Sequence, residues 1–224
     1  MRYYRRPLAD VARALYTFFR SSTSYRLRIA LAYKGLAYDP HYVSLPKMQH
    51  REDAYRALNP QGLVPVLVDE GKRYVQSMAM IEYLDETYPE PPLLPKAIYE
   101  RAYVRAVSQI IGCDIHPLNN VRVLKRLQTQ FKADEVMVSE WYGHWVAEGL
   151  STLEDFVTRE ALSGRFIYGD VVSMADICLV PQIFNAQRFS CPLDAYPKLM
   201  TIFDNCMGVA AFRDTQPSTQ PDAF

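Results

Sequence analysis

The sequence has no excess charge of either sign, few glycines and no long apolar run. Its 224 residues include 25 lysines or arginines, 25 aspartates or glutamates and only nine glycines. Balanced charge argues against a large basic surface for nucleic acid or anionic lipid. No apolar run approaches the roughly 18 residues that a membrane-spanning helix needs. We therefore expect neither a nucleic-acid partner nor a membrane partner.

Several motifs that carry chemistry are also missing. The sequence contains no glycine-rich phosphate loop, no zinc-protease motif and no serine-hydrolase elbow. The four histidines are far apart and the four cysteines form no C-x-x-C pair, so we expect no metal site and no disulfide framework. The arginine-rich amino terminus lacks the apolar segment of a signal peptide, and we interpret it as a short extension of a reduced, cytoplasmic protein. The sequence offers no obvious nucleophile of its own, so if the protein is an enzyme we expect its reactive group to be borrowed.

The first 90 residues alternate between strand and helix patterns. An aromatic and β-branched run over 15–19 predicts a strand, and a cluster of hydroxyls leads from it into a helix over 25–34 that ends at Gly35. Further strands are expected over 37–45, 64–68 and 74–75, and further helices over 52–58 and 77–87. The predicted order is βαβαββα.

A proline-rich linker follows, and the pattern after it is entirely helical. Four prolines fall within 87–95, and such a stretch favours extended backbone. Helical spacing then predicts helices over roughly 103–111, 118–130, 134–161, 174–188 and 197–206. Ser173 and Asp176 fit a capping box, and the tail from Thr215 to Phe224 is expected to be irregular. We predict an α/β plus all-α protein, with an α/β domain over 13–92 and an all-helical domain over 97–224.

This organisation resembles that of the cytosolic glutathione transferases. The segment 59–65, Asn-Pro-Gln-Gly-Leu-Val-Pro, resembles the one that ends in the family's cis-proline, and Gln76-Ser77 resembles the pair that binds the γ-glutamyl end of glutathione. Segment 21–31 resembles the signature of the zeta class, and zeta patterns recur over 169–181, 185–189 and 220–222. The resemblance covers roughly residues 15–222. It implies a thioredoxin-like βαβαββα domain, a C-terminal helical bundle and a homodimer.

Two departures from the zeta pattern point to one branch of the class. Thr23 stands where the signature usually has cysteine, and His116 stands where maleylacetoacetate isomerases tend to carry glutamine. Both departures resemble the bacterial glutathione-dependent maleylpyruvate isomerases. The resemblance implies glutathione as cofactor, a small dicarboxylate as substrate and conversion of maleylpyruvate to fumarylpyruvate. The alternatives are maleylacetoacetate isomerisation, general glutathione transfer or dehalogenation, and a non-catalytic binding module.

Three hydroxyls at the start of the helix over 25–34 are candidates for activating a glutathione thiol. A helix N-terminus favours an anion, and a hydroxyl that donates a hydrogen bond favours it further. The resemblance favours Thr23, with Ser21 and Ser22 as the alternatives, and capping alone would also account for all three. Tyr16 is the remaining candidate activator, although we expect it to be a packing residue of the first strand.

The glutathione contacts are assigned mainly by the resemblance. A cis Val64–Pro65 bond would leave backbone groups free to pair with the glutathione backbone, although a strand-edge proline with no ligand is the alternative. The expected contacts, of which the first and last are the weakest, are His50, Gln61, Val64, Pro65, Gln76, Ser77 and Asn120.

The substrate residues are assigned in the same way. Arginine matches a carboxylate bidentately, and three arginines fall where maleylpyruvate isomerases bind their substrate: Arg20, Arg122 and Arg188. His116 would contact glutathione or shuttle a proton, and a structural role is nearly as strongly expected. If the chain stays helical after Pro117, His116 and Asn120 share a helix face.

Overall fold

The computed structural model describes residues 13–224, which form two compact units. Among the described residues, unit 1 contains 13–91 together with Asp214–Phe224, and unit 2 contains Pro92–Arg213. Residues 1–12 of the expected amino-terminal extension lie outside the described residues. The helical domain was expected to run to residue 224, but the tail groups with unit 1: Asp222 of the tail accepts a hydrogen bond from the N–H of Phe19, and Arg28 of α1 donates to the carbonyl of Thr215.

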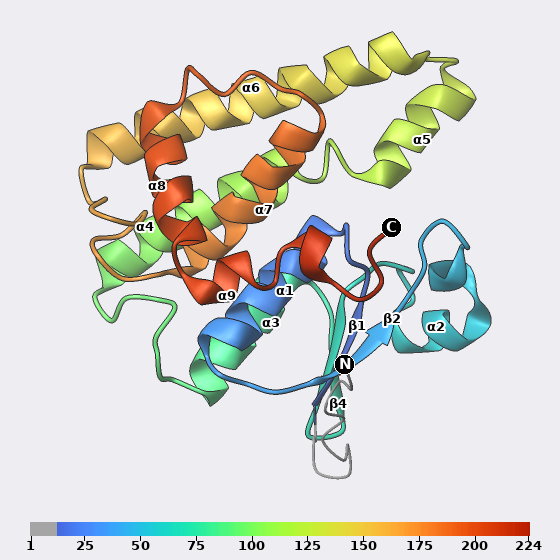
Figure 1. The fold of residues 1–224 in the computed structure, drawn as a ribbon, viewed down its shortest axis with the longest axis horizontal. Helices are drawn as coiled ribbons and strands as arrows, with labels where there is room; N and C mark the ends of the chain where they lie inside the picture. Colours follow the sequence, from blue (N-terminus) through green and yellow to red (C-terminus); the bar gives the residue numbers. More distant parts are fainter. Residues whose placement is uncertain (1–12) are drawn as a thin grey trace. The chain divides into compact units, whose positions relative to one another are not determined.

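Unit 1 is built on a four-stranded sheet with the order β2-β1-β3-β4. β1 runs parallel to β2 and antiparallel to β3, which in turn pairs antiparallel with β4. Figure 1 shows α1 and α3 on one side of the sheet and α2 on the other. The elements of this unit are β1 (Arg13–Thr17), α1 (Ser22–Tyr33), β2 (Asp39–Tyr42), η2 (Gln49–Arg51), α2 (Asp53–Leu58), β3 (Val66–Asp69), β4 (Lys72–Tyr74), α3 (Ser77–Thr87) and η4 (Pro217–Thr219).

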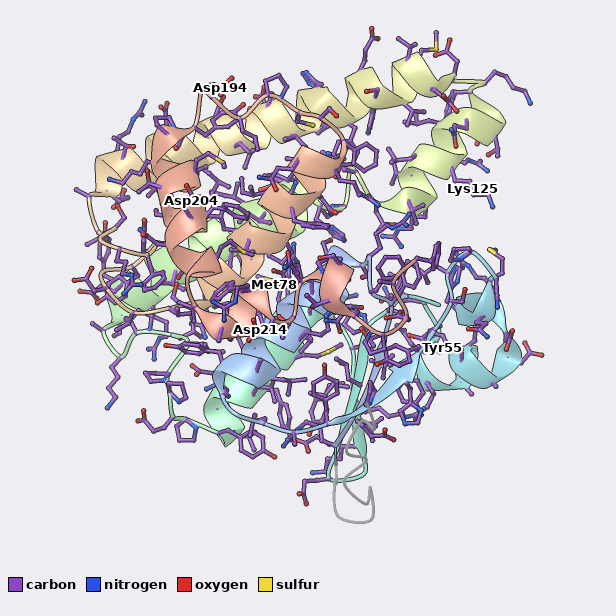
Figure 2. The ribbon with its side chains drawn as sticks, viewed as in Figure 1. Tyr55, Met78, Lys125, Asp194, Asp204 and Asp214 are labelled. Atoms are coloured by element: carbon purple, nitrogen blue, oxygen red, sulfur yellow. The ribbon has the colours of Figure 1, made fainter. Side chains whose placement is uncertain are left out.

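The face of the sheet toward α2 is filled by a small aromatic and aliphatic cluster. Tyr55 of α2 (labelled in Figure 2) packs with Val43 and Val66, and Tyr16 of β1 packs against the same cluster. The ring of Tyr16 also stacks on His41, with centroids 4.6 Å apart. Tyr16 is therefore a packing residue of this face.

Unit 2 is a bundle of helices arranged around α7. Twelve of the 15 residues of α7 are buried, which is the pattern of a helix enclosed on all sides. Figure 1 shows the long helix α6, drawn in yellow, with α5 at one end of it. The elements are α4 (Ile98–Gln109), η3 (Ile110–Ile115), α5 (Val121–Gln130), α6 (Glu135–Glu160), α7 (Met174–Arg188), α8 (Pro197–Met207) and α9 (Ala210–Arg213). Among residues 13–224, no helix has the length and apolarity needed to cross a membrane.

The predicted site histidine, His116, directly follows a π-helical turn. α4 continues into η3, and the N–H of His116 donates to the carbonyl of Ile111, five residues earlier, at 2.9 Å. A new helix then begins, and Asn120 is its N-cap, accepting a hydrogen bond from the N–H of Arg122 at 3.1 Å. The helix is not continuous from His116 to Asn120, so the two residues do not share a helix face. Short π-helical turns are often found at functional sites.

Asp176 caps the start of α7 from a fully buried position. Its carboxylate accepts hydrogen bonds from the N–H and hydroxyl of Ser173, at 2.8 and 2.7 Å, and from the N–H of Ile167 at 2.8 Å. The predicted capping box is therefore present. Burial nevertheless raises the pKa of the Asp176 carboxyl to about 6.

The raised pKa of Asp176 predicts a specific pH dependence of stability. Between about pH 4 and pH 6 the folded protein holds a proton that the unfolded chain has already released. The contribution of Asp176 to the free energy of unfolding should therefore decrease as the pH rises through this range, by at most ~1.4 kcal/mol per pH unit. Urea denaturation of the wild type and Asp176→Asn at several pH values would measure it. A difference between the two proteins that does not change with pH would contradict the prediction.

Candidate active site

The predicted hydroxyl cluster lies at the first turn of α1. Ser21 is the N-cap, and its Oγ accepts a hydrogen bond from the N–H of Ser24 at 3.2 Å. The hydroxyl of Thr23 lies 2.9 Å from Ser21 Oγ and donates to the carbonyl oxygen of Val64 at 3.0 Å. The Val64–Pro65 peptide bond is cis, as the resemblance implied. The structure thus brings together the start of α1 and the backbone just before Pro65.

Each hydroxyl of this cluster has only one proton to donate, so a hydrogen bond that it already donates limits what it can donate to a ligand. Thr23 has one hydroxyl proton, and while it is donated to Val64 it is not available to a sulfur atom. Ser21 accepts from Ser24 and still has its own proton to donate, either to Thr23 or to a ligand. Ser22 is buried within the same turn. Geometry alone therefore keeps both Ser21 and Thr23 as candidate donors.

Polar side chains from three segments of unit 1 surround the start of α3. Gln76 directly precedes the helix with a φ of 70°, which residues other than glycine rarely adopt. Its Nε2 donates to Oε1 of Gln61 at 2.8 Å, and both side chains are exposed. Ser77, the first residue of α3, is buried, and its hydroxyl accepts from Nη1 of Arg26 at 3.3 Å. The predicted glutathione residues Gln61, Gln76 and Ser77 are thus close neighbours.

Arg26 belongs to this group but was not predicted. Its side chain is only 1% exposed, and its Nε and Nη2 have no hydrogen-bond partner among residues 13–224. Its positive charge lies next to the N-terminus of α3, which is also electropositive. The only signal in the sequence was a charged residue between the apolar positions Tyr25 and Leu27 of a buried helix.

The loop that leads to Pro65 is held in place by its own side chains. Asn59 donates to the carbonyl of Leu63 at 2.8 Å and accepts from the N–H of Gln61 at 3.1 Å. Gly62 has a φ of 60°, and a Cβ atom there would lie 2.8 Å from the backbone oxygen of His50. His50 is half-buried in η2. This close approach fixes Gln61 and His50 in neighbouring segments.

The remaining predicted residues lie partly in unit 1 and partly in unit 2. Arg20 is half-buried and directly precedes Ser21. His116 is half-buried at the end of η3, and Arg122 is exposed in the first turn of α5. Arg188 is exposed at the last position of α7. The convergence of the three arginines on one substrate stays a prediction.

An aromatic stack supports Arg188 in unit 2. Its guanidinium lies 4.7 Å from the ring centroid of Phe189, and that ring stacks on Tyr142 with centroids 3.7 Å apart. Burial raises the pKa of Tyr142 above its ordinary value, and the charge of Arg188 opposes this rise. Tyr142 therefore stays a neutral phenol at physiological pH.

Comparison with known proteins gives the family. A family described as "Glutathione S-transferase, N-terminal domain" matches residues 15–92. The maleylacetoacetate isomerase of Pseudomonas aeruginosa is 47% identical over 93% of this chain and 97% of that protein. A solved holo structure of a maleylpyruvate isomerase, a bacterial zeta-class glutathione S-transferase, has a TM-score of 0.92 at 44% identity, covering 94% of this chain and 100% of the other.

A second solved structure carries ligands. The maleylacetoacetate isomerase of Methylobacterium extorquens AM1, solved with bound malonate and glutathione, has a TM-score of 0.91 at 35% identity over 94% of this chain and 99% of that one. These likenesses confirm the predicted glutathione transferase fold. The chain belongs to the zeta-class glutathione transferases, in the family of maleylacetoacetate and maleylpyruvate isomerases.

Proposed function

We propose that the protein isomerises maleylpyruvate to fumarylpyruvate with glutathione as its cofactor. The observation that carries the proposal is the hydroxyl pair of Ser21 and Thr23, at the start of α1 and bonded to the carbonyl before cis-Pro65. Relatives that cover nearly the whole chain are named maleylacetoacetate and maleylpyruvate isomerases. Thr23 and His116 favour maleylpyruvate over maleylacetoacetate, since both match the maleylpyruvate isomerase pattern.

The residues around the start of α3 fit glutathione. The unpartnered nitrogens of buried Arg26, the hydroxyl of Ser77 and the N-terminus of α3 together suit a carboxylate such as that of a γ-glutamyl group. The exposed amides of Gln61 and Gln76 suit its polar atoms, and the backbone of Val64 and Pro65 suits the peptide of the cofactor. His50 and Asn120 are weaker candidate contacts.

The chemistry follows from the thiol and from the charges that this chain supplies. Glutathione, when bound, would supply a nucleophilic thiolate, whose addition would turn the double bond of the substrate into a single bond that can rotate and whose loss would restore the double bond in the trans form. A thiol with its ordinary pKa of about 8.5 gives little thiolate at neutral pH. The N-terminus of α1 and a hydroxyl of Ser21 or Thr23 would favour the thiolate and so lower that pKa.

The substrate is a dianion that develops further negative charge as it reacts. We propose that Arg20, Arg122 and Arg188 bind its carboxylates and the developing oxyanion, since preorganised cations stabilise such charge strongly. His116, at the end of η3, would move a proton or contact glutathione. Both roles follow from the match to the family pattern.

Isomerase assays with and without glutathione test the proposed function. We expect turnover of both maleylpyruvate and maleylacetoacetate, with the higher kcat/KM for maleylpyruvate and no net consumption of glutathione. Stoichiometric consumption of glutathione with organic halides, without isomerisation, would favour a general transferase or dehalogenase. Turnover of neither cis-enedioate would refute the proposal.

We also propose that the protein is a cytoplasmic homodimer, as the family resemblance implies. Light scattering after size-exclusion chromatography should give about twice the 25.8 kDa mass of the chain. A mass equal to that of one chain would refute the dimer.

A further inference from the structure

The C-terminal tail, residues 214–224, binds the turn that carries Arg20. Oδ2 of Asp222 accepts a hydrogen bond from the N–H of Phe19 at 2.9 Å, although the two residues are 203 positions apart. Phe19 is buried and Asp222 is half-buried, so the bond is partly shielded from water. A hydrogen bond to a carboxylate is stronger than one between neutral groups. Asp222 therefore fixes the residue directly before Arg20.

The tail also contacts the Arg20 side chain itself. The guanidinium lies 4.9 Å from the ring centroid of Phe19 and 5.3 Å from that of Phe224, and these two rings are 5.0 Å apart, edge to face. Nη2 of Arg20 donates to the backbone oxygen of Phe224 at 3.3 Å. Two rings and a backbone oxygen thus restrict a long side chain that would otherwise have many rotamers.

A second arginine binds the carbonyl group of Phe19. Arg28 is buried on α1, and its Nη2 donates to the carbonyl of Phe19 while its Nε donates to the carbonyl of Thr215, both at 3.0 Å. Phe19 is therefore held through its N–H by Asp222 and through its carbonyl by Arg28. Burial lowers the pKa of Arg28 to about 10, and the charge of Asp222 opposes that decrease, so Arg28 stays cationic at neutral pH.

We infer that Asp222 is a positioning residue that orients Arg20 toward a substrate carboxylate. The inference rests on the proposed role of Arg20 in binding the dicarboxylate. Asp222 bonds to the backbone of Phe19 and lies two residues before Phe224, and the rings of Phe19 and Phe224 are the two aromatic neighbours of the Arg20 guanidinium. Orienting Arg20 before the substrate arrives removes part of the entropy cost of binding.

The test is a double-mutant cycle between Asp222 and Arg20, with kinetics on maleylpyruvate. Asp222→Ala should raise KM roughly three- to tenfold with little change in kcat, because ordering one side chain is worth about that much in binding. The dissociation constant of glutathione, measured by calorimetry, should stay within about twofold of the wild-type value. In an Arg20→Ala background, Asp222→Ala should change KM less than about twofold.

Conservative and matched variants separate positioning from general destabilisation. Asp222→Asn keeps an oxygen that can accept from Phe19, so its KM should lie between those of the wild type and Asp222→Ala. Ser218→Ala, an exposed change in the same tail, and Asp194→Ala, an exposed carboxylate of unit 2 (Figure 2), should keep the wild-type KM. If Asp222→Ala does not fold, Phe224→Leu removes a ring beside Arg20 and should raise KM in the same way.

Equal KM values for the wild type, Asp222→Ala and Phe224→Leu would overturn the inference. Fully additive free-energy effects of Asp222→Ala and Arg20→Ala on KM would also overturn it, because the two residues would then act independently. Malonate binding separates failure of this inference from failure of the proposed function, because it can be measured without turnover. Malonate is a small dicarboxylate that is bound in a related isomerase. Without any wild-type isomerisation, weaker malonate binding by both Arg20→Ala and Asp222→Ala would still support positioning, whereas malonate binding unchanged by Asp222→Ala would overturn it.

Discussion

Replacing Arg188 with alanine should lower kcat/KM for maleylpyruvate roughly ten- to 150-fold. A hydrogen bond between charged groups contributes about 1.5–3 kcal/mol, and this range gives that factor if the contact is fully made in the transition state. The glutathione dissociation constant should be unchanged, since Arg188 is assigned to the dicarboxylate. Steady-state kinetics together with calorimetry of glutathione binding would measure both effects.

The surroundings of Arg188 explain why an exposed arginine has a defined position. Its guanidinium lies against Phe189, whose ring stacks on the buried Tyr142. Arg188 is also the last residue of α7, and a cation is favoured at the C-terminal end of a helix. The aromatic stack and the helix end together restrict the side chain before any ligand binds.

Two variants control the Arg188 experiment. Arg188→Lys keeps the charge but loses the bidentate geometry of the guanidinium, so its kcat/KM should lie between those of the wild type and Arg188→Ala. Arg159→Ala removes an exposed arginine of α6 that pairs with Asp155 four residues away, and it should leave kcat/KM unchanged. If Arg188→Ala behaves like Arg159→Ala, Arg188 is an ordinary surface charge.

Local signals in the sequence predicted two helices with the bounds that they have in the structure. The helix over 77–87 has the predicted bounds, and so does the helix over 174–188. In the second case Ser173 and Asp176 mark the first turn and bond to each other in the structure. A capping box needs only residues three positions apart, so the sequence alone reveals it.

The first strand shows where local signals stop. The aromatic run predicted a strand over 15–19, but β1 covers Arg13–Thr17. Phe18 and Phe19 leave the sheet because their N–H groups bind side chains instead, Ser24 for Phe18 and Asp222 for Phe19. Aromatic composition cannot distinguish a residue in a strand from one in the turn after it.

The candidate site was predicted by motif and extended by the structure. The hydrogen bond from Thr23 to Val64 joins two segments that motifs in the sequence had already singled out: the hydroxyl cluster before the first helix and the segment that ends at Pro65. Arg26 and Asp222 were missed because their significance depends on partners 51 and 203 positions away. The π-helical turn of η3 was also missed, since apolar spacing does not distinguish it from continued α-helix.

Replacing Thr23 with valine should raise the pKa of the bound glutathione thiol by about one to two units. Valine keeps the shape of threonine but has no proton to donate, so a thiolate would lose a hydrogen bond of about 1.5–3 kcal/mol. Ultraviolet titration of the thiolate in the binary complex would measure the shift. The rate at neutral pH should fall less than the thiolate fraction does, because a more basic thiolate is also a better nucleophile.

The comparison with Ser21 decides which hydroxyl activates the thiol. Ser21→Gly removes the other hydroxyl, and glycine at an N-cap costs only a few tenths of a kcal/mol, so α1 should stay intact. Thr23→Ser keeps the hydroxyl and should keep the wild-type thiol pKa. If Ser21→Gly raises the thiol pKa and Thr23→Val does not, then Thr23 donates to Val64 throughout, as it does in this structure, and Ser21 is the activating donor.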